Sequence, residues 1–191
     1  MPRFLGVSSE NAAHRFAVEW DQGGQVYQGV YIPRRDASSR LNTLVGGRLF
    51  PGVHHHAQFQ VNEREEHFSL DLDSDDRTTH VAVQGSIAAE LPTNSIFSSL
   101  QEASDFFEAG SLGYSDSAKS NEYDGLELRT FDWKVQPLEI ERVESSFFED
   151  RKLFPLGTIE FDSALLMQGI KHEWIGRESL KPILAADSMS P

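Results

Sequence analysis

The chain contains no cysteine among its 191 residues. Disulfide bonds, cysteine-ligated zinc and cysteine nucleophiles are therefore excluded. The sequence also lacks the motifs G-x-S-x-G and G-x-G-x-x-G and the P-loop, which are typical of serine hydrolases and of dinucleotide and nucleoside-triphosphate sites. No cofactor is expected.

Long apolar runs are missing as well. No window approaches the ~20 consecutive apolar residues that a membrane-spanning helix needs. Residues 1–16 lack the continuous apolar stretch of a secretory signal peptide, so we expect a cytoplasmic protein.

Positive charge is scarce. Seventeen Lys and Arg residues stand against thirty Asp and Glu residues, which gives a formal net charge of −13. An acidic surface repels phosphate backbones, so nucleic acids and anionic membranes are not expected as partners. The sequence leaves the oligomeric state open and is compatible with a homo-oligomer.

Apolar residues are sufficient for one packed interior, with 39% hydrophobic residues and thirteen Phe. The length fits a single domain, which we expect over residues 1–175. Residues 176–191 have weak periodicity, and they are expected to form a C-terminal tail.

Alternation of apolar and polar residues predicts mostly strands. Residues 14–20 and 25–33 flank Asp21-Gln-Gly-Gly24, whose glycines suit the tight turn of a hairpin. Further strands are predicted over residues 53–61, 67–72, 79–87, 126–135, 138–148 and 158–172. The middle of the chain is therefore expected to be a meander.

One helix is predicted over residues 100–109. Ser99 is its expected cap, Glu102 completes a capping box, and Gly110 suits a left-handed end. Residues 111–124 are rich in Ser, Gly and Asp, which is typical of a long loop, and we expect a lid there. Eight or nine strands with one helix indicate a mainly β protein, a closed or nearly closed antiparallel barrel whose inward polar residues converge on a cavity.

Five segments carry a resemblance to known proteins: GVYIPRRDASSRLNTLVGGRLFPGVHHHAQF, FFEAGSLGYS, DGLELR, ESSFFED and FDSALLMQGIKHEW. They resemble an uncharacterised family of conserved bacterial proteins that is similar in fold to acetoacetate decarboxylase. The resemblance covers most of residues 14–174 and implies a β-barrel with a central cavity. That enzyme uses a Schiff-base lysine activated by an adjacent lysine. Here the five lysines are isolated in sequence, so no decarboxylase is predicted.

Three successive histidines occupy positions 54–56. On a strand, His54 and His56 share a face, a spacing seen in metal-binding barrels, and His80 or Glu127 would complete such a site. The glutamate that follows the histidine pair in cupins is absent, because Gln60 and Val61 stand there. A hydrogen-bonding role is favoured, no metal is assigned, and a metal-dependent enzyme is the lower-ranked alternative.

Arginines cluster in the same region of an otherwise acidic chain. Arginine binds carboxylates and phosphates in a bidentate way, so a small organic anion is the expected ligand. We choose Arg34, which follows the rigid Pro33, and Arg48, which follows two glycines. Tyr114 in the expected lid is a further candidate.

Two functions follow from these patterns. The first is a small-molecule cavity in the barrel, binding or catalytic, with Arg34 and Arg48 on an anionic group and His54 or His56 as hydrogen-bonding or acid-base groups. Whether turnover occurs is left open. The alternative is a noncatalytic scaffold barrel that binds a partner and has a filled interior.

Overall fold

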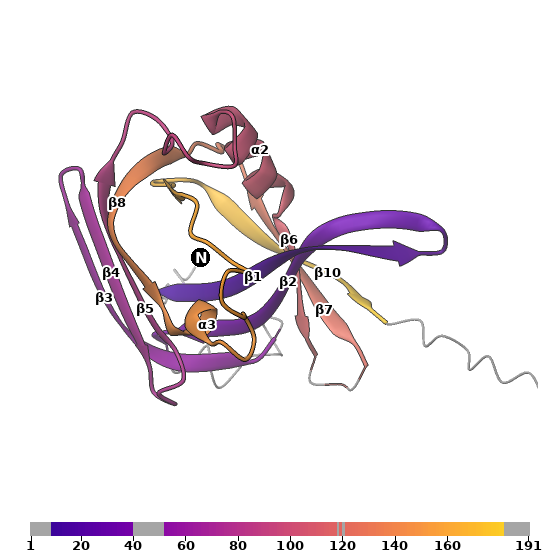
Figure 1. Ribbon diagram of the computed structural model, residues 1–191. Helices are drawn as coiled ribbons and strands as arrows, with labels where there is room; N and C mark the ends of the chain where they lie inside the picture. The colour runs from indigo at the N-terminus through magenta and orange to yellow at the C-terminus, as the bar shows by residue number, and fades with distance from the viewer. Residues whose placement is uncertain (1–8, 40–51, 118, 120, 182–191) are drawn as a thin grey trace, which may run out of the picture.

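The computed structural model describes residues 9–39, 52–117, 119 and 121–181 (Figure 1). Within these ranges the chain forms ten strands and two helices, and all strands belong to one sheet. The strands are β1 Asn11–Gln22, β2 Gln25–Ala37, β3 His54–Arg64, β4 His67–Ser74, β5 His80–Ile87, β6 Leu112–Asp116, β7 Tyr123–Thr130, β8 Gln136–Ser145, β9 Ala164–Leu166 and β10 His172–Leu180. The helices are α2 Leu100–Ala109 and α3 Ser146–Glu149.

The predicted hairpin is confirmed. Strands β1 and β2 pair antiparallel from Asn11 opposite Ala37 to Gln22 opposite Gln25. Gly23 and Gly24 form the turn with φ angles of 67° and 84°, a left-handed conformation that glycine adopts without strain. In Figure 1 this long hairpin extends away from the rest of the sheet.

Strand β2 changes neighbours along its length. Val30 and Tyr31 pair in parallel with β6, whereas residues Arg35–Ala37 pair in parallel with β3. The change coincides with Pro33, which lacks the N–H group that a continuous ladder would use. Strand β2 is therefore the corner that joins the two parts of the sheet.

The sheet runs in the order β10-β7-β6-β2-β3-β4-β5-β8-β9, with β1 paired to β2 beside this path. The other pairings are antiparallel, and no pairing among the described residues connects β9 to β10. The mainly β architecture predicted from the sequence is confirmed, but the sheet is not closed into a cylinder. Its curvature is visible where β3, β4, β5 and β8 wrap around one side (Figure 1).

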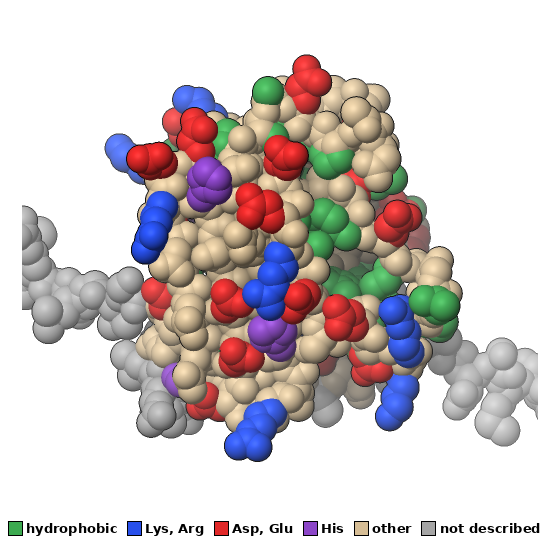
Figure 2. Space-filling view, turned by 60° about the vertical axis from the view of Figure 1, so that its left-hand side comes forward, with side chains coloured by type: hydrophobic (Ala, Val, Ile, Leu, Met, Phe, Trp, Pro, Cys, Tyr) green, Lys and Arg blue, Asp and Glu red, His purple; other side chains and the backbone are tan. Residues whose placement is uncertain are grey.

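The meander has one apolar and one polar face, as its alternation predicts. Phe59, Leu72 and Val81 lie in register across β3, β4 and β5, and Leu72 has no exposed surface. On the opposite face Gln58 and Asp73 are exposed. Figure 2 shows this side of the molecule, where acidic side chains are spread between fewer Lys and Arg residues. The apolar face therefore forms the core, and the polar face is hydrated.

Helix α2 has the predicted bounds and begins at the predicted cap. The Ser99 hydroxyl accepts a hydrogen bond from the Glu102 N–H at 3.1 Å, while the Glu102 carboxylate accepts one from the Ser98 N–H. The left-handed end predicted for Gly110 is wrong, because its φ is −78°. A Cβ there would lie 3.3 Å from Val30 Cγ1, so the glycine allows close packing on β2.

Three other local predictions are corrected by the structure. The expected lid contains strand β6, because Gly113 is small enough to lie against Ile32, whose Cδ1 would be 2.6 Å from a Cβ. Within residues 158–172 only β9 and the first residue of β10 are strand. The expected tail from residue 176 continues β10 to Leu180, because the strand is held by pairing with β7.

The chain has no helix, within the residues described, with the length and apolarity to cross a membrane.

Truncation of Leu72 tests the position of the core. We expect Leu72→Ala to lower the free energy of unfolding by about 2–5 kcal/mol, because it leaves a cavity in close-packed surroundings. Leu156→Ala is the matched control, since Leu156 is 85% exposed, and its effect should stay within about 0.5 kcal/mol. Urea denaturation of both variants measures the difference. Equal effects would place the core elsewhere.

Candidate functional site

A cavity of about 220 Å³ lies where the two parts of the sheet meet at β2. We call it the arginine cavity. Its walls come from β1, β2, β3, β7 and β10, so it depends on the corner that β2 makes. It is lined by Asn11, Ala12, Ala13, Arg15, Arg35, Asp36, His54, Leu126 and Trp174.

Strand register decides which side chains face this cavity. Arg35 is directly opposite Ala13 of β1 and His54 of β3. Paired residues of neighbouring strands project to the same face, so these three residues share one side of the sheet. Their chain neighbours Arg34 and His55 project to the other side, the side of Phe59 and the apolar core.

Arg34, which the sequence analysis chose as a ligand-binding residue, is fully engaged inside the protein. Its Nε and Nη2 donate to the carboxylate of Asp36 at 3.0 and 2.8 Å, and Nη1 donates to Thr78 Oγ1 at 2.8 Å and to Asp76 at 3.2 Å. Burial alone would lower the pKa of Arg34, but these bonds and the two carboxylate charges raise it. Arg34 therefore has a structural role, because it connects Asp36, Asp76 and Thr78. The structure does not support the prediction that it binds a ligand.

Arg35 has the opposite environment. It is 8% exposed, and its Nε donates to Ser115 Oγ at 3.2 Å. Among the described residues no carboxylate forms an ion pair with it. Burial and the like charge of Arg15 lower the pKa of Arg35 to about 10, so the guanidinium remains charged at neutral pH.

Arg15 brings a second guanidinium to the cavity. It is the single residue of β1 that faces Ile32 and Pro33 of β2, because the register shifts by one residue between His14 and Phe16. Arg15 is exposed at the mouth of the cavity, and partial desolvation there lowers its pKa. It has no ion-pair partner in the described part of the chain.

Gly52 supports Arg35 from the start of the segment that leads into β3. It is buried, its φ is +91°, and a Cβ there would lie 2.8 Å from Ser115 Cβ and 3.4 Å from Arg35 Nε. A larger residue would collide with the Arg35–Ser115 hydrogen bond. The glycine therefore fixes how closely the backbone approaches the buried guanidinium.

The other predicted site residues are separated by the fold. His54 lines the arginine cavity, as an anion site requires. His56 is bonded on both ring nitrogens, to the Asp75 carboxylate at 2.7 Å and to the Ser38 carbonyl at 3.1 Å. Tyr114 is in β6, where it contacts Trp20 edge-on at a ring distance of 5.4 Å. Arg48 lies outside the described residues.

Tyr114 is away from the arginine cavity. Its register partner in β7 is Gly125, and its pKa is raised by burial. A Cβ at Gly125 would lie 2.8 Å from Tyr114 Cε1, so the ring packs over the glycine. These contacts indicate a packing role.

The histidine run does not form a metal centre in the part of the chain that the structure describes, where no group of three or more His, Asp or Glu residues has suitable geometry. His54 and His56 share a face, but His55 projects oppositely and pairs with Asp76 at 3.0 Å. Of the two residues expected to complete such a site, His80 pairs with Asp73 at 2.9 Å and Glu127 pairs with Arg177. The carboxylates of Asp73 and Asp76 each orient one imidazole.

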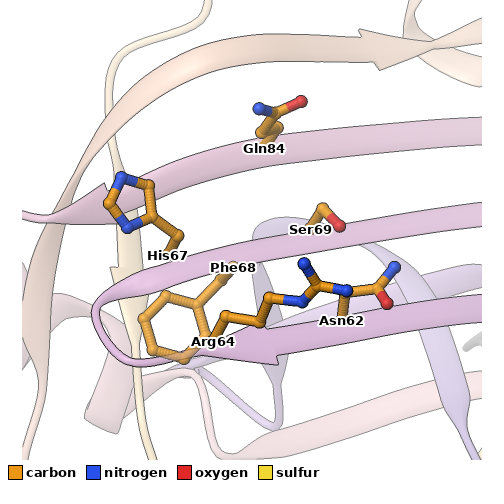
Figure 3. A pocket seen from close by; sticks show the side chains of 6 residues that line it. All are labelled: Asn62, Arg64, His67, Phe68, Ser69 and Gln84. Atoms are coloured by element: carbon orange, nitrogen blue, oxygen red, sulfur yellow. The ribbon is translucent and has the colours of Figure 1, made fainter.

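A second depression, of about 310 Å³, lies at the β3–β4 hairpin (Figure 3). Asn62, Ser69 and Gln84 form a row across β3, β4 and β5, with Arg64 and His67 near the hairpin end. Arg64, His67 and Gln84 are exposed. Charges in full contact with water bind ligands weakly, and the arginine cavity is the stronger candidate because Arg35 in it is 8% exposed.

Scans against protein-family models, curated proteins and solved structures give no match to this chain. The chemistry of the arginine cavity is therefore inferred from its own side chains. Two guanidinium groups offer several N–H donors to a carboxylate or phosphate. Of the arginines clustered in the sequence, Arg35 lines this cavity and Arg34 does not, and Arg15 carried no signal beyond its charge.

Replacing each neighbouring arginine by methionine tests the assignment. Arg34→Met should lower the free energy of unfolding by about 3–5 kcal/mol, because it leaves Asp36 buried without its counter-charge. Arg35→Met should remain within about 1 kcal/mol of the wild type, because it removes a buried charge for which the described residues supply no ion pair. Denaturation by guanidinium chloride measures the free energy of unfolding of both variants. A larger loss for Arg35→Met would contradict the assignment.

The contacts of Arg34 with Asp76 also predict that the stability of the protein depends on pH. Burial by itself would raise the pKa of Asp76, but hydrogen bonds from Ser74 and Thr78 and the charge of Arg34 lower it well below its ordinary value of 3.8. A carboxyl whose pKa is lower in the folded state adds stability above the unfolded value, and this stability is lost as pH falls through the folded pKa. The stability difference between wild type and Asp76→Asn should therefore shrink below about pH 4. A pH-independent difference, measured by urea denaturation, would show that the charge of Asp76 is not involved.

Proposed function

We propose that the protein binds a small organic anion in the arginine cavity. The observation that carries this proposal is that Arg15 and Arg35 face one cavity without a carboxylate partner in the described residues. The cavity is positive although the whole chain has a formal charge of −13. An anion of matching size would offset the mutual repulsion of the two guanidinium groups.

Burial makes this site selective for anions. A charged group that is taken out of water loses hydration free energy, and the loss is recovered only through hydrogen bonds and opposite charge. Arg35 is 8% exposed, and within the described residues it makes one hydrogen bond, to Ser115. A bound carboxylate or phosphate would accept its remaining N–H donors at short distance.

The other walls indicate that the ligand has a carbon skeleton. Leu126 and Trp174 line the cavity from β7 and β10, and Trp174 is 42% exposed. Contact of a ligand with these side chains would remove apolar surface from water. His54 lies beside Arg35 in register, where an imidazole can exchange a hydrogen bond or a proton with the ligand.

The relation to acetoacetate decarboxylase-like proteins is part of this proposal. It is supported by the sequence segments described above and by the curved, mainly β sheet, whereas the arginine cavity lies on the side of β2 opposite the apolar core. Schiff-base chemistry is not included, because all five lysines are exposed, and Lys134 has 80% of its side chain in solvent. Binding of a soluble metabolite also suits the cytoplasmic location expected from the sequence.

Thermal-shift and calorimetric titrations with benzoate test the function. We expect benzoate to raise the unfolding midpoint, because it binds only the folded form, and benzyl alcohol to leave it unchanged. Arg35→Met and Arg15→Met should each weaken benzoate binding roughly 10- to 100-fold, the loss expected for a charge-assisted hydrogen bond.

Arg142→Met is the matched control, since Arg142 pairs with Glu144 on β8, away from the cavity. It should bind benzoate like the wild type. Equal binding by all three variants, or equal binding of the alcohol, would overturn the anion site.

A further inference from the structure

A second hollow shares Arg15 with the arginine cavity. It has a volume of about 420 Å³ and lies between the β1–β2 hairpin and helix α2. We call it the helix groove. Its floor includes Ala17 and Val30, and its wall includes Phe106, Phe107 and Ala109.

Arg15 borders both hollows. Alternate residues of a strand face the same way, so Ala13, Arg15 and Ala17 follow one another along one face of β1. Ala13 belongs to the arginine cavity and Ala17 to the helix groove. The neighbours of Arg15 on this face are small, and Arg15 lines both hollows, so a ligand held by Arg15 can contact the walls of both.

The helix groove is apolar and incompletely covered. Phe106 and Phe107 are 51% and 46% exposed, although their rings contact each other at 5.4 Å and Phe97 packs against both. Ala17 is exposed as well. Exposed aromatic surface in a concave site favours an apolar occupant, because contact would remove that surface from water.

The far end of the helix groove carries negative charge. Glu19 follows Ala17 on the same face of β1 and accepts a hydrogen bond from Gln28 at 2.6 Å. The two ends are therefore of opposite sign, with Arg15 at one and Glu19 at the other. A ligand with a second anionic group at the end of its chain would meet like charge there.

We infer that the ligand is an amphipathic monocarboxylic acid, whose carboxylate binds Arg15 and Arg35 and whose alkyl or aryl-alkyl chain occupies the helix groove. This inference rests on the proposed anion site and specifies its ligand class. The site favours this class over short acids, dicarboxylates and inorganic phosphate. It has positive charge at the arginine end, apolar walls along the helix groove and Glu19 at the far end.

A chain-length series tests the inference by isothermal titration calorimetry below the micellar concentration. We expect affinity to rise from butanoate through hexanoate to octanoate, by about fourfold for each buried methylene. Octanedioate should bind more weakly than octanoate, and Glu19→Gln should reduce this difference because it removes the like charge.

A variant that fills the helix groove tests whether the chain of the ligand binds there. Ala17→Phe places a ring on the floor of the helix groove and should abolish the gain from butanoate to octanoate while butanoate binding persists. Val26→Phe is the control, because Val26 is 63% exposed near the hairpin turn and does not line the groove. It should keep the full dependence on chain length.

The outcomes separate the two proposals. Acids that bind through Arg35 with equal affinity at every length would overturn the chain site and leave the anion site intact. Chain-length dependence that survives Ala17→Phe would also overturn it. Failure of every acid to bind would remove the anion site, and the chain inference with it.

Discussion

The buried pairing of Arg34 with Asp36 is the interaction on which the site depends. Asp36 has no exposed surface, and the guanidinium fork of Arg34 satisfies both of its carboxylate oxygens. Because both residues project to one side of β2, Arg35 between them must project to the other. The ion pair thus fixes the orientation of a charge that it does not contact.

The distribution of ion pairs explains how the arginine cavity can be positive in an acidic chain. Other arginines of the strands, such as Arg129, Arg142 and Arg177, each pair with a carboxylate on the sheet surface. Arg15 and Arg35 instead line the arginine cavity, where no described carboxylate forms an ion pair with either, because Asp36 in the same lining is bound by Arg34. Their local potential is set by the walls of the cavity, and the excess of acidic residues elsewhere contributes little across a hydrated surface.

Local patterns in the sequence predicted the elements well, and the long-range contacts only in part. The β1–β2 hairpin was predicted from Gly23-Gly24, and helix α2 from the spacing of residues after Ser99. Both are local signals. Asp76, which accepts a hydrogen bond from Arg34, is 42 residues away in the chain. No local sequence pattern could therefore show that Arg34 is paired inside the described part of the protein and Arg35 is not. Arg15 lies at a register shift, opposite Ile32 and Pro33 of the partner strand, which no local pattern in β1 indicates. The strand predicted over residues 158–172 is reduced to β9 and the first residue of β10, and no described pairing joins these two strands, so the predicted closure is not confirmed.

The irregular pairing at Arg15 has a consequence for solubility. Strand β1 has β2 on one side and no other strand partner among the described residues, so it presents an edge of free backbone groups. A straight, flat edge of this kind can recruit a strand from another molecule and begin aggregation, and a local kink with a charged residue discourages such contacts. The same distortion that directs a guanidinium into the cavity therefore also helps to keep neighbouring molecules from joining edge to edge.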